Sequence, residues 1–101
     1  MTSEALGRMP EWKPDGLYMT VLRFLPAYRT ARDRLDVRAL GKQPEIQRSP
    51  EAIYKWFRAD DLFDANNGRA LVAVANQPAN AALLAAEGIK PPTLADLLQF
   101  I

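Results

Sequence analysis

Apolar positions recur along the chain at intervals of three and four residues, which is the spacing of one face of an α-helix. Near the N-terminal end this stripe consists of Leu17, Val21, Phe24, Leu25 and Tyr28. Pro26 interrupts it, and proline both removes an intrahelical hydrogen bond and crowds the preceding turn. We therefore predict a helix over about 17–25 that breaks or kinks at Pro26.

Two more helices are predicted in the middle of the chain. The first covers 36–43, with Asp36 as its cap, small Gly41 permitting a close neighbour and Pro44 preventing its extension. The second covers 50–58 and has the clearest start signal, because Ser49 caps it, Pro50 suits its first position and Glu51 complements its dipole. Its inward stripe is Ala52, Ile53, Trp56 and Phe57, while Tyr54, Lys55 and Arg58 lie on its other sides.

The C-terminal half predicts three further helices. The first, 65–76, follows Asp64 or Asn67 as its cap and is nearly all apolar, which places it in the middle of the core. The others are 79–86, closed by Gly88, and 94–100. Sustained strand alternation is absent from the sequence, so the predicted fold class is all-α, with about five or six short helices in one domain over 17–101 and a loose arm over 1–16.

Composition removes most catalytic chemistry. The chain has neither cysteine nor histidine, so disulfides, thiolate nucleophiles, cysteine-based zinc sites and imidazole bases are all excluded. Asp60, Asp61 and Asp64 are the main acidic cluster, but no nucleophile or glycine-rich phosphate loop accompanies them. We therefore read them as a solvated connector and expect no enzyme activity and no cofactor.

No apolar run approaches the roughly 18 residues of a membrane span, and the first residues lack the apolar core of a signal peptide. The absence of cysteine fits a reducing compartment. We therefore expect a cytoplasmic protein without a membrane partner.

The formal net charge of +1 hides a basic block. Residues 23–58 carry nine Lys and Arg against four Asp and Glu, whereas the segments before and after are acidic. Arginine-rich surfaces suit polyanions, because guanidinium groups pair bidentately with phosphate. The alternative is a solvated helix face, on which Arg29, Arg32 and Arg34 neutralise nearby Asp33 and Asp36 along their own helix.

The strings Leu35–Gly41 and Ser49–Trp56 together resemble the helix-turn-helix of small phage and bacterial repressors of the Cro and CI type, whose fold is lambda-repressor-like. Gly41 falls on the family's small-residue position and Ile46 on its apolar turn position. Two features differ. Gln47 and Arg48 make an insertion of two residues before Ser49, and Pro44 stands where a leucine normally extends the first helix, so the turn is expected to be longer than usual.

The resemblance implies a sequence-specific regulator of transcription that binds double-stranded DNA as a homodimer, with residues 50–58 in the major groove. Ser49 would donate to a phosphate, and Glu51, Ala52 and Lys55 would face base edges. Tyr54 and Arg58 would reach the DNA backbone, assisted by Arg48 and Lys42. Three structural alternatives stay open: Tyr54 covers the edge of the core, Trp56 packs inside it, and Glu51 only complements the helix dipole.

The main alternative function is a small helical adaptor or inhibitor, of phage type, that binds protein and not DNA. Leu94, Leu97, Leu98 and Ile101 would share one apolar face of an α-helix, with Asp96 and Gln99 pointing away. This face either folds back on its own core or pairs with a second subunit. We favour the dimer, because a symmetric operator requires one.

Overall fold

The computed structural model describes residues 12–58 and 63–101, and it is all-α. Its α-helices are α1 (Leu17–Phe24), α2 (Val37–Gly41), α3 (Pro50–Phe57), α4 (Ala65–Ala75) and α5 (Pro78–Ala86), and its 3-10 helices are η2 (Pro26–Tyr28) and η3 (Leu94–Phe100). Within these ranges the only β structure is one isolated antiparallel bridge, between Arg29 and Leu35. The predicted fold class is therefore confirmed.

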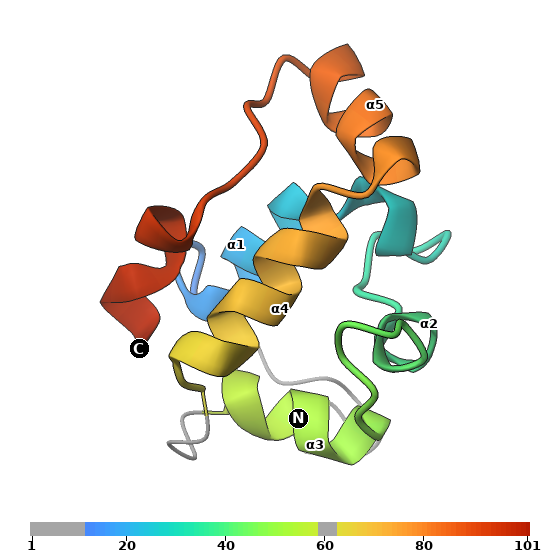
Figure 1. Cartoon of the computed structure of the whole chain (residues 1–101). Coiled ribbons are helices and arrows are strands. Elements are labelled where there is room, and N and C mark those ends of the chain that lie inside the picture. Colours follow the sequence, from blue (N-terminus) through green and yellow to red (C-terminus); the bar gives the residue numbers. More distant parts are fainter. Residues whose placement is uncertain (1–11, 59–62) are drawn as a thin grey trace, which may run out of the picture.

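The central helix is α4, as the apolar composition of 65–76 predicted. It crosses the middle of the molecule next to α1, with α3 beneath its first turn, α2 to one side, η3 on the opposite side and α5 at the far end (Figure 1). Its buried residues Leu71, Val74 and Ala75 join a core to which α1, α2, α3 and η3 also contribute buried side chains, and Leu84 of α5 is 0% exposed. Each fully buried leucine or valine in such a core stabilises the fold by about 1.5–3 kcal/mol.

The chain breaks at Pro26, as predicted, and a buried amide closes the break. α1 ends at Phe24 and the short η2 begins at Pro26. The side chain of Asn80, which is 0% exposed, donates to the carbonyls of Phe24 and Ala75 at 2.9 and 2.8 Å and accepts from the Ala27 amide at 3.0 Å. Asn80 thus satisfies backbone groups that the end of α1, the end of α4 and η2 would otherwise leave unpaired.

Residues 29–36 do not form a helix, so the alternative in which Arg29, Arg32 and Arg34 neutralise aspartates along their own helix is wrong. The Thr30 amide donates to the Arg34 carbonyl at 2.7 Å, and Asp33 has a left-handed φ of 58°, which makes a tight turn. Arg29 instead forms an ion pair with Glu87 at 3.5 Å and donates to the Leu22 carbonyl at 3.1 Å. Arg29 is therefore a structural tie between α1 and α5.

The C-terminal segment is a 3-10 helix, so the single apolar face expected from 3.6-residue spacing is also wrong. Three residues per turn align Leu94, Leu97 and Phe100, and these are the side chains that pack inward. Leu98 and Ile101 are 56% and 47% exposed. The segment docks on α4 of its own chain, where Gly68 leaves room for Leu94 and Ile101. Of the two alternatives for the C-terminal segment, η3 thus folds back on the core of its own chain.

The expected loose arm, 1–16, is described only from Trp12 onward. The acidic pair Asp60 and Asp61 lies outside the described residues. In the described part of the arm, Trp12 already packs against the core, and the Gly16 amide donates to the Lys13 carbonyl at 3.0 Å. No helix within 12–58 or 63–101 has both the length and the apolar character needed to cross a bilayer.

Candidate nucleic-acid interface

Two capped helices form the centre of the candidate site. α2 follows Asp36, whose carboxylate accepts a hydrogen bond from the Ala39 amide at 3.1 Å. α3 follows Ser49, whose hydroxyl oxygen accepts from the Ala52 amide at 3.2 Å. Both caps are the predicted ones. Because each cap satisfies an amide at the helix start, the residue at which α2 and α3 begin is fixed by the sequence itself.

Gly41 brings these two helices together. The Arg48 amide donates to the Gly41 carbonyl at 3.1 Å. A Cβ atom on Gly41 would overlap the Arg48 carbonyl oxygen and would lie 3.3 Å from the Cδ1 atom of Ile53. Only glycine allows the backbone of the turn to approach so closely. The predicted close-packing role of Gly41 is confirmed.

The turn between α2 and α3 spans 42–48 and is well ordered by hydrogen bonds. The amides of Ile46 and Gln47 both donate to the Gln43 carbonyl at 2.9 Å, and the Ile46 side chain is buried. Gln47 has a left-handed φ of 49°. α2 ends at Gly41, two residues earlier than predicted, because the residue before Pro44 is disfavoured in helical geometry.

α3 divides cleanly into a buried and an exposed face. Ile53, Trp56 and Phe57 are buried, which confirms the structural reading of Trp56. Glu51, Lys55 and Arg58 are exposed and follow each other at spacings of four and three, so they share the outward face. Ala52 and Tyr54 are half-buried at its borders.

Tyr54 and Arg58 interact with each other. The guanidinium carbon of Arg58 lies 5.5 Å from the centre of the Tyr54 ring, within the range of a cation–π contact. Burial raises the pKa of the Tyr54 hydroxyl above 10.0, and Tyr18 raises it further, whereas Arg58 and Arg34 lower it. Tyr54 thus packs at the edge of the core and keeps a protonated hydroxyl.

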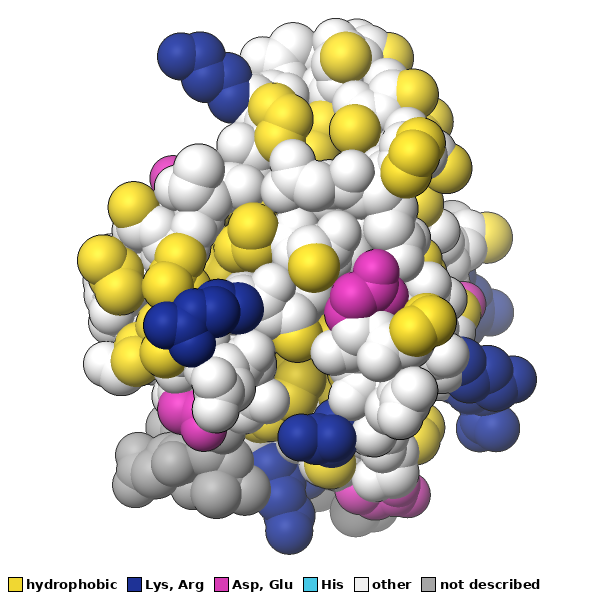
Figure 2. Space-filling model, viewed as in Figure 1, with side chains coloured by type: hydrophobic (Ala, Val, Ile, Leu, Met, Phe, Trp, Pro, Cys, Tyr) yellow, Lys and Arg dark blue, Asp and Glu magenta, His cyan; other side chains and the backbone are white. Residues whose placement is uncertain are grey.

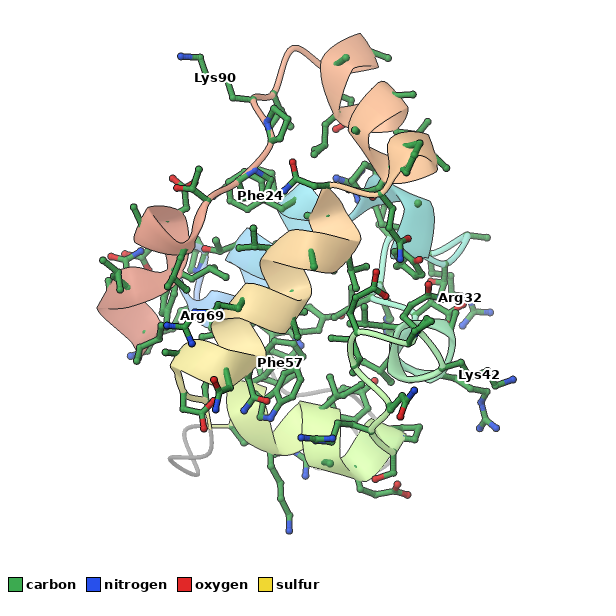
Figure 3. The ribbon with its side chains drawn as sticks, in the orientation of Figure 1. Phe24, Arg32, Lys42, Phe57, Arg69 and Lys90 are labelled. Carbon is green, nitrogen blue, oxygen red and sulfur yellow. The ribbon has the colours of Figure 1, made fainter. Side chains whose placement is uncertain are left out.

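The side chains of Arg48 and Lys42 point in different directions. One guanidinium nitrogen of Arg48 donates to the carbonyls of Ile46 and Gln47, both at 3.3 Å, so this side chain rests on its own turn. Lys42 follows α2 and points away from the molecule on the same side as Arg32 (Figure 3). The structure therefore brings Arg48 to the start of α3 and leaves Lys42 at a separate edge.

A polar hollow of about 390 Å³ lies between α3 and the start of α4. Five of the eight predicted site residues line it, namely Arg48, Ser49, Glu51, Ala52 and Lys55. The opposite wall consists of Asp64, Asn66 and Asn67. The Asp64 carboxylate accepts from the Asn67 amide at 2.9 Å and so caps α4.

Basic side chains dominate this end of the molecule. Residues 34–58 contain six Lys and Arg against three Asp and Glu. In Figure 2 dark blue side chains project at the lower and right-hand edges, over α3 and α2, with magenta side chains among them. Lys90 and Arg69 add one dark blue side chain each at the upper left and left (Figure 3). Within the described ranges no cluster of metal-ligating side chains was found.

No protein-family model, curated protein or solved structure matches this chain. Its function is therefore inferred from the chemistry of this surface.

Sequence reasoning missed one wall of the hollow. Asn66 was predicted only as part of a helix start, and Asn67 as an alternative to the Asp64 cap that the structure shows. Their place opposite Lys55 depends on how the start of α4 packs beside α3. The only signal in the sequence was the pair of adjacent amides two and three residues after the Asp64 cap. Amide side chains both donate and accept hydrogen bonds, so they suit phosphates and base edges equally well.

Proposed function

We propose that this chain is a sequence-specific regulator of transcription that binds double-stranded DNA, with α3 in the major groove. The observation that carries the proposal is the outward face of α3, where Glu51, Lys55 and Arg58 stand on one side of a capped helix. An α-helix is about 10–12 Å across with its side chains, and the major groove is about 12 Å wide.

The chemistry of this face supports base reading by three residues. The Lys55 ammonium can donate to the guanine acceptors O6 and N7, and the Glu51 carboxylate can accept from the cytosine amino group. The Ala52 methyl can meet a thymine methyl. Pro50 falls on a position where repressors of the Cro and CI type, which the sequence resembles, often read a base with glutamine, so this chain would read its site with fewer contacts.

Phosphate contacts would come from the rim of the same hollow. The Ser49 oxygen already accepts from Ala52, which leaves its hydroxyl proton free to donate to a phosphate. Arg48 supplies positive charge at this hollow and Asn66 adds an amide from α4, whereas Arg58 lies outside the hollow at the C-terminal end of α3. Lys42, which points elsewhere, would contribute only long-range attraction.

We further propose a homodimer in the cytoplasm. The exposed Leu98 and Ile101 form the surface that a second copy would cover, because the rest of η3 already packs on its own core. The same exposed leucine and isoleucine favour the second candidate function, a helical adaptor that binds protein.

Selection from a randomised duplex library tests the proposal and separates the two functions. A regulator enriches a common sequence, and its affinity falls with salt with a log–log slope of about −0.9 per phosphate contacted. An adaptor enriches no sequence, and its partner affinity lacks this slope. Lys90 is the matched control for Lys55, since it is also an exposed lysine but lies at the opposite end of the molecule (Figure 3). Loss of enrichment with Lys55→Gln but not Lys90→Gln is expected.

A further inference from the structure

A second hollow lies where α1 begins and α3 ends. Its volume is about 640 Å³, which is within the range of small-molecule sites in proteins. It differs from the polar hollow in its lining, because five of the residues around it are aromatic: Trp12, Tyr18, Trp56, Phe57 and Phe100. We refer to it as the aromatic cavity.

The rings of the aromatic cavity hold fixed orientations. Trp12 stacks on Tyr18 with a distance of 4.4 Å between ring centres and an angle of 16° between ring planes. Tyr18 in turn meets Phe57 edge to face at 5.2 Å and 89°. Trp12 is only half-buried despite this packing. Tyr18, Trp56 and Phe57 are buried in the core, so a flat ring entering the cavity would meet chiefly the half-buried rings of Trp12 and Phe100.

Charge at the aromatic cavity favours an anion. Two cationic side chains, Lys13 and Arg58, line it against one carboxylate, Asp15. The start of α1 adds to this bias, because its first turn holds no acidic residue. Aromatic cages that bind quaternary ammonium ions use the negative ring faces instead, and a net positive lining opposes such a ligand.

We propose that the aromatic cavity binds a small molecule that combines a planar aromatic ring with an anionic group. The ring would lie against the half-buried Trp12 and Phe100, and the anion would face Lys13 and Arg58. Two sources share this chemistry, an aromatic carboxylate and a mononucleotide. Ligand binding in the aromatic cavity does not require DNA. Because Trp56, Phe57 and Arg58 form the C-terminal end of α3, a ligand there would also contact the proposed recognition helix.

The two tryptophans make the test direct. The chain has two tryptophans, and both line the aromatic cavity, so the two indole N–H signals of a nitrogen-15 correlation spectrum report on it. Trp12 is the specific reporter, because Trp56 also lines the polar hollow. The full chain is titrated without DNA against 2-naphthoate as the aromatic carboxylate and AMP as the nucleotide. Neutral 2-naphthamide and choline are the charge controls. Binding of either anion shifts both signals and saturates at or below about 1 mM, and the tighter anion identifies the source.

The charge is tested with matched lysine variants. Lys13→Gln is expected to weaken anion binding about fivefold, and Lys90→Gln is expected to leave it unchanged. The dispersed backbone signals of the same spectra show whether each variant is folded. Three results would overturn the proposal: no saturable shift with either anion, equal affinity for 2-naphthoate and 2-naphthamide, or tighter binding of choline. Because DNA is absent from all of these titrations, failure here leaves the proposed regulator unaffected, and failure of DNA binding leaves the cavity unaffected.

Discussion

The carbonyl oxygen of Arg48 occupies the space that a side chain on Gly41 would need. This contact closes the turn between α2 and α3, and the Arg48 amide seals it with a hydrogen bond to the Gly41 carbonyl at 3.1 Å. The orientation of α3, and with it the placement of Lys55 and Arg58, depends on a position where no side chain fits. The candidate site is therefore sensitive to a residue that does not itself face solvent.

Gly41→Ala is expected to destabilise the protein by about 1–3 kcal/mol or more, because the backbone must move to admit the methyl group. Gly68→Ala is the matched control. Its Cβ would come within 2.9 Å of the Cδ1 atom of Leu94, which is the far end of a side chain and can turn away, so a change of about 1 kcal/mol or less is expected. Urea unfolding of both variants measures the difference, and equal losses would show that the turn can relax.

Asn80→Ala is expected to cost about 2–4 kcal/mol. The variant leaves the Phe24 and Ala75 carbonyls and the Ala27 amide without their partner, in a place from which water is excluded. Asn66→Ala is the control, since Asn66 is exposed on the first turn of α4, and a change within about 0.5 kcal/mol is expected. Thermal unfolding compares the two; similar melting temperatures would mean that another group or a water replaces the Asn80 amide.

Local signals in the sequence predicted most of the helices. Proline, serine and aspartate act within a few residues of themselves, so Pro26, Asp36, Ser49 and Asp64 placed the start or end of a helix close to where the structure has it. The outward face of α3 followed from the same local spacing.

Features that depend on packing could not be predicted in this way. Spacings of three and of 3.6 residues differ little over seven residues, so the sequence of 94–100 did not separate a 3-10 helix from an α-helix, although the two bury different leucines. Asn80 joins residues 53 and 56 positions away from it, and Asn66 reaches the hollow only through the crossing of α4 and α3. Such partners are visible only in the folded chain.

Lys55→Ala and Arg48→Ala are expected to weaken DNA binding in different ways. Loss of Lys55 removes a contact to a base edge, which should cost about 1–3 kcal/mol on the selected sequence and relax the preference at one position. Loss of Arg48 removes a phosphate contact, which should weaken binding to all duplexes and lower the salt slope by about one.

Fluorescence anisotropy at several salt concentrations separates these two effects, with Lys90→Ala as the unaffected control. Normal affinity in both variants, with intact helical circular dichroism, would remove α3 from the DNA interface.

The neighbouring leucines of η3 separate folding from dimer formation. Leu97 is 2% exposed in the core and Leu98 is 56% exposed, although both have the same side chain. Leu97→Ala is expected to destabilise the fold by about 2–5 kcal/mol. Leu98→Ala should change stability by less than about 0.5 kcal/mol and weaken the proposed dimer. Deletion of 92–101 would remove Leu97 as well, so it is expected to destabilise the monomer and not to release it intact.

Sedimentation equilibrium and urea unfolding of the two point variants together test this assignment. If the intact chain is a dimer at tens of micromolar and Leu98→Ala sediments as a folded monomer, the exposed edge of η3 is the dimer surface. If the intact chain is already a monomer, the exposed edge of η3 is not a dimer surface, and DNA binding would use a single half-site. An unchanged dimer in Leu98→Ala would place the interface on another part of the molecule.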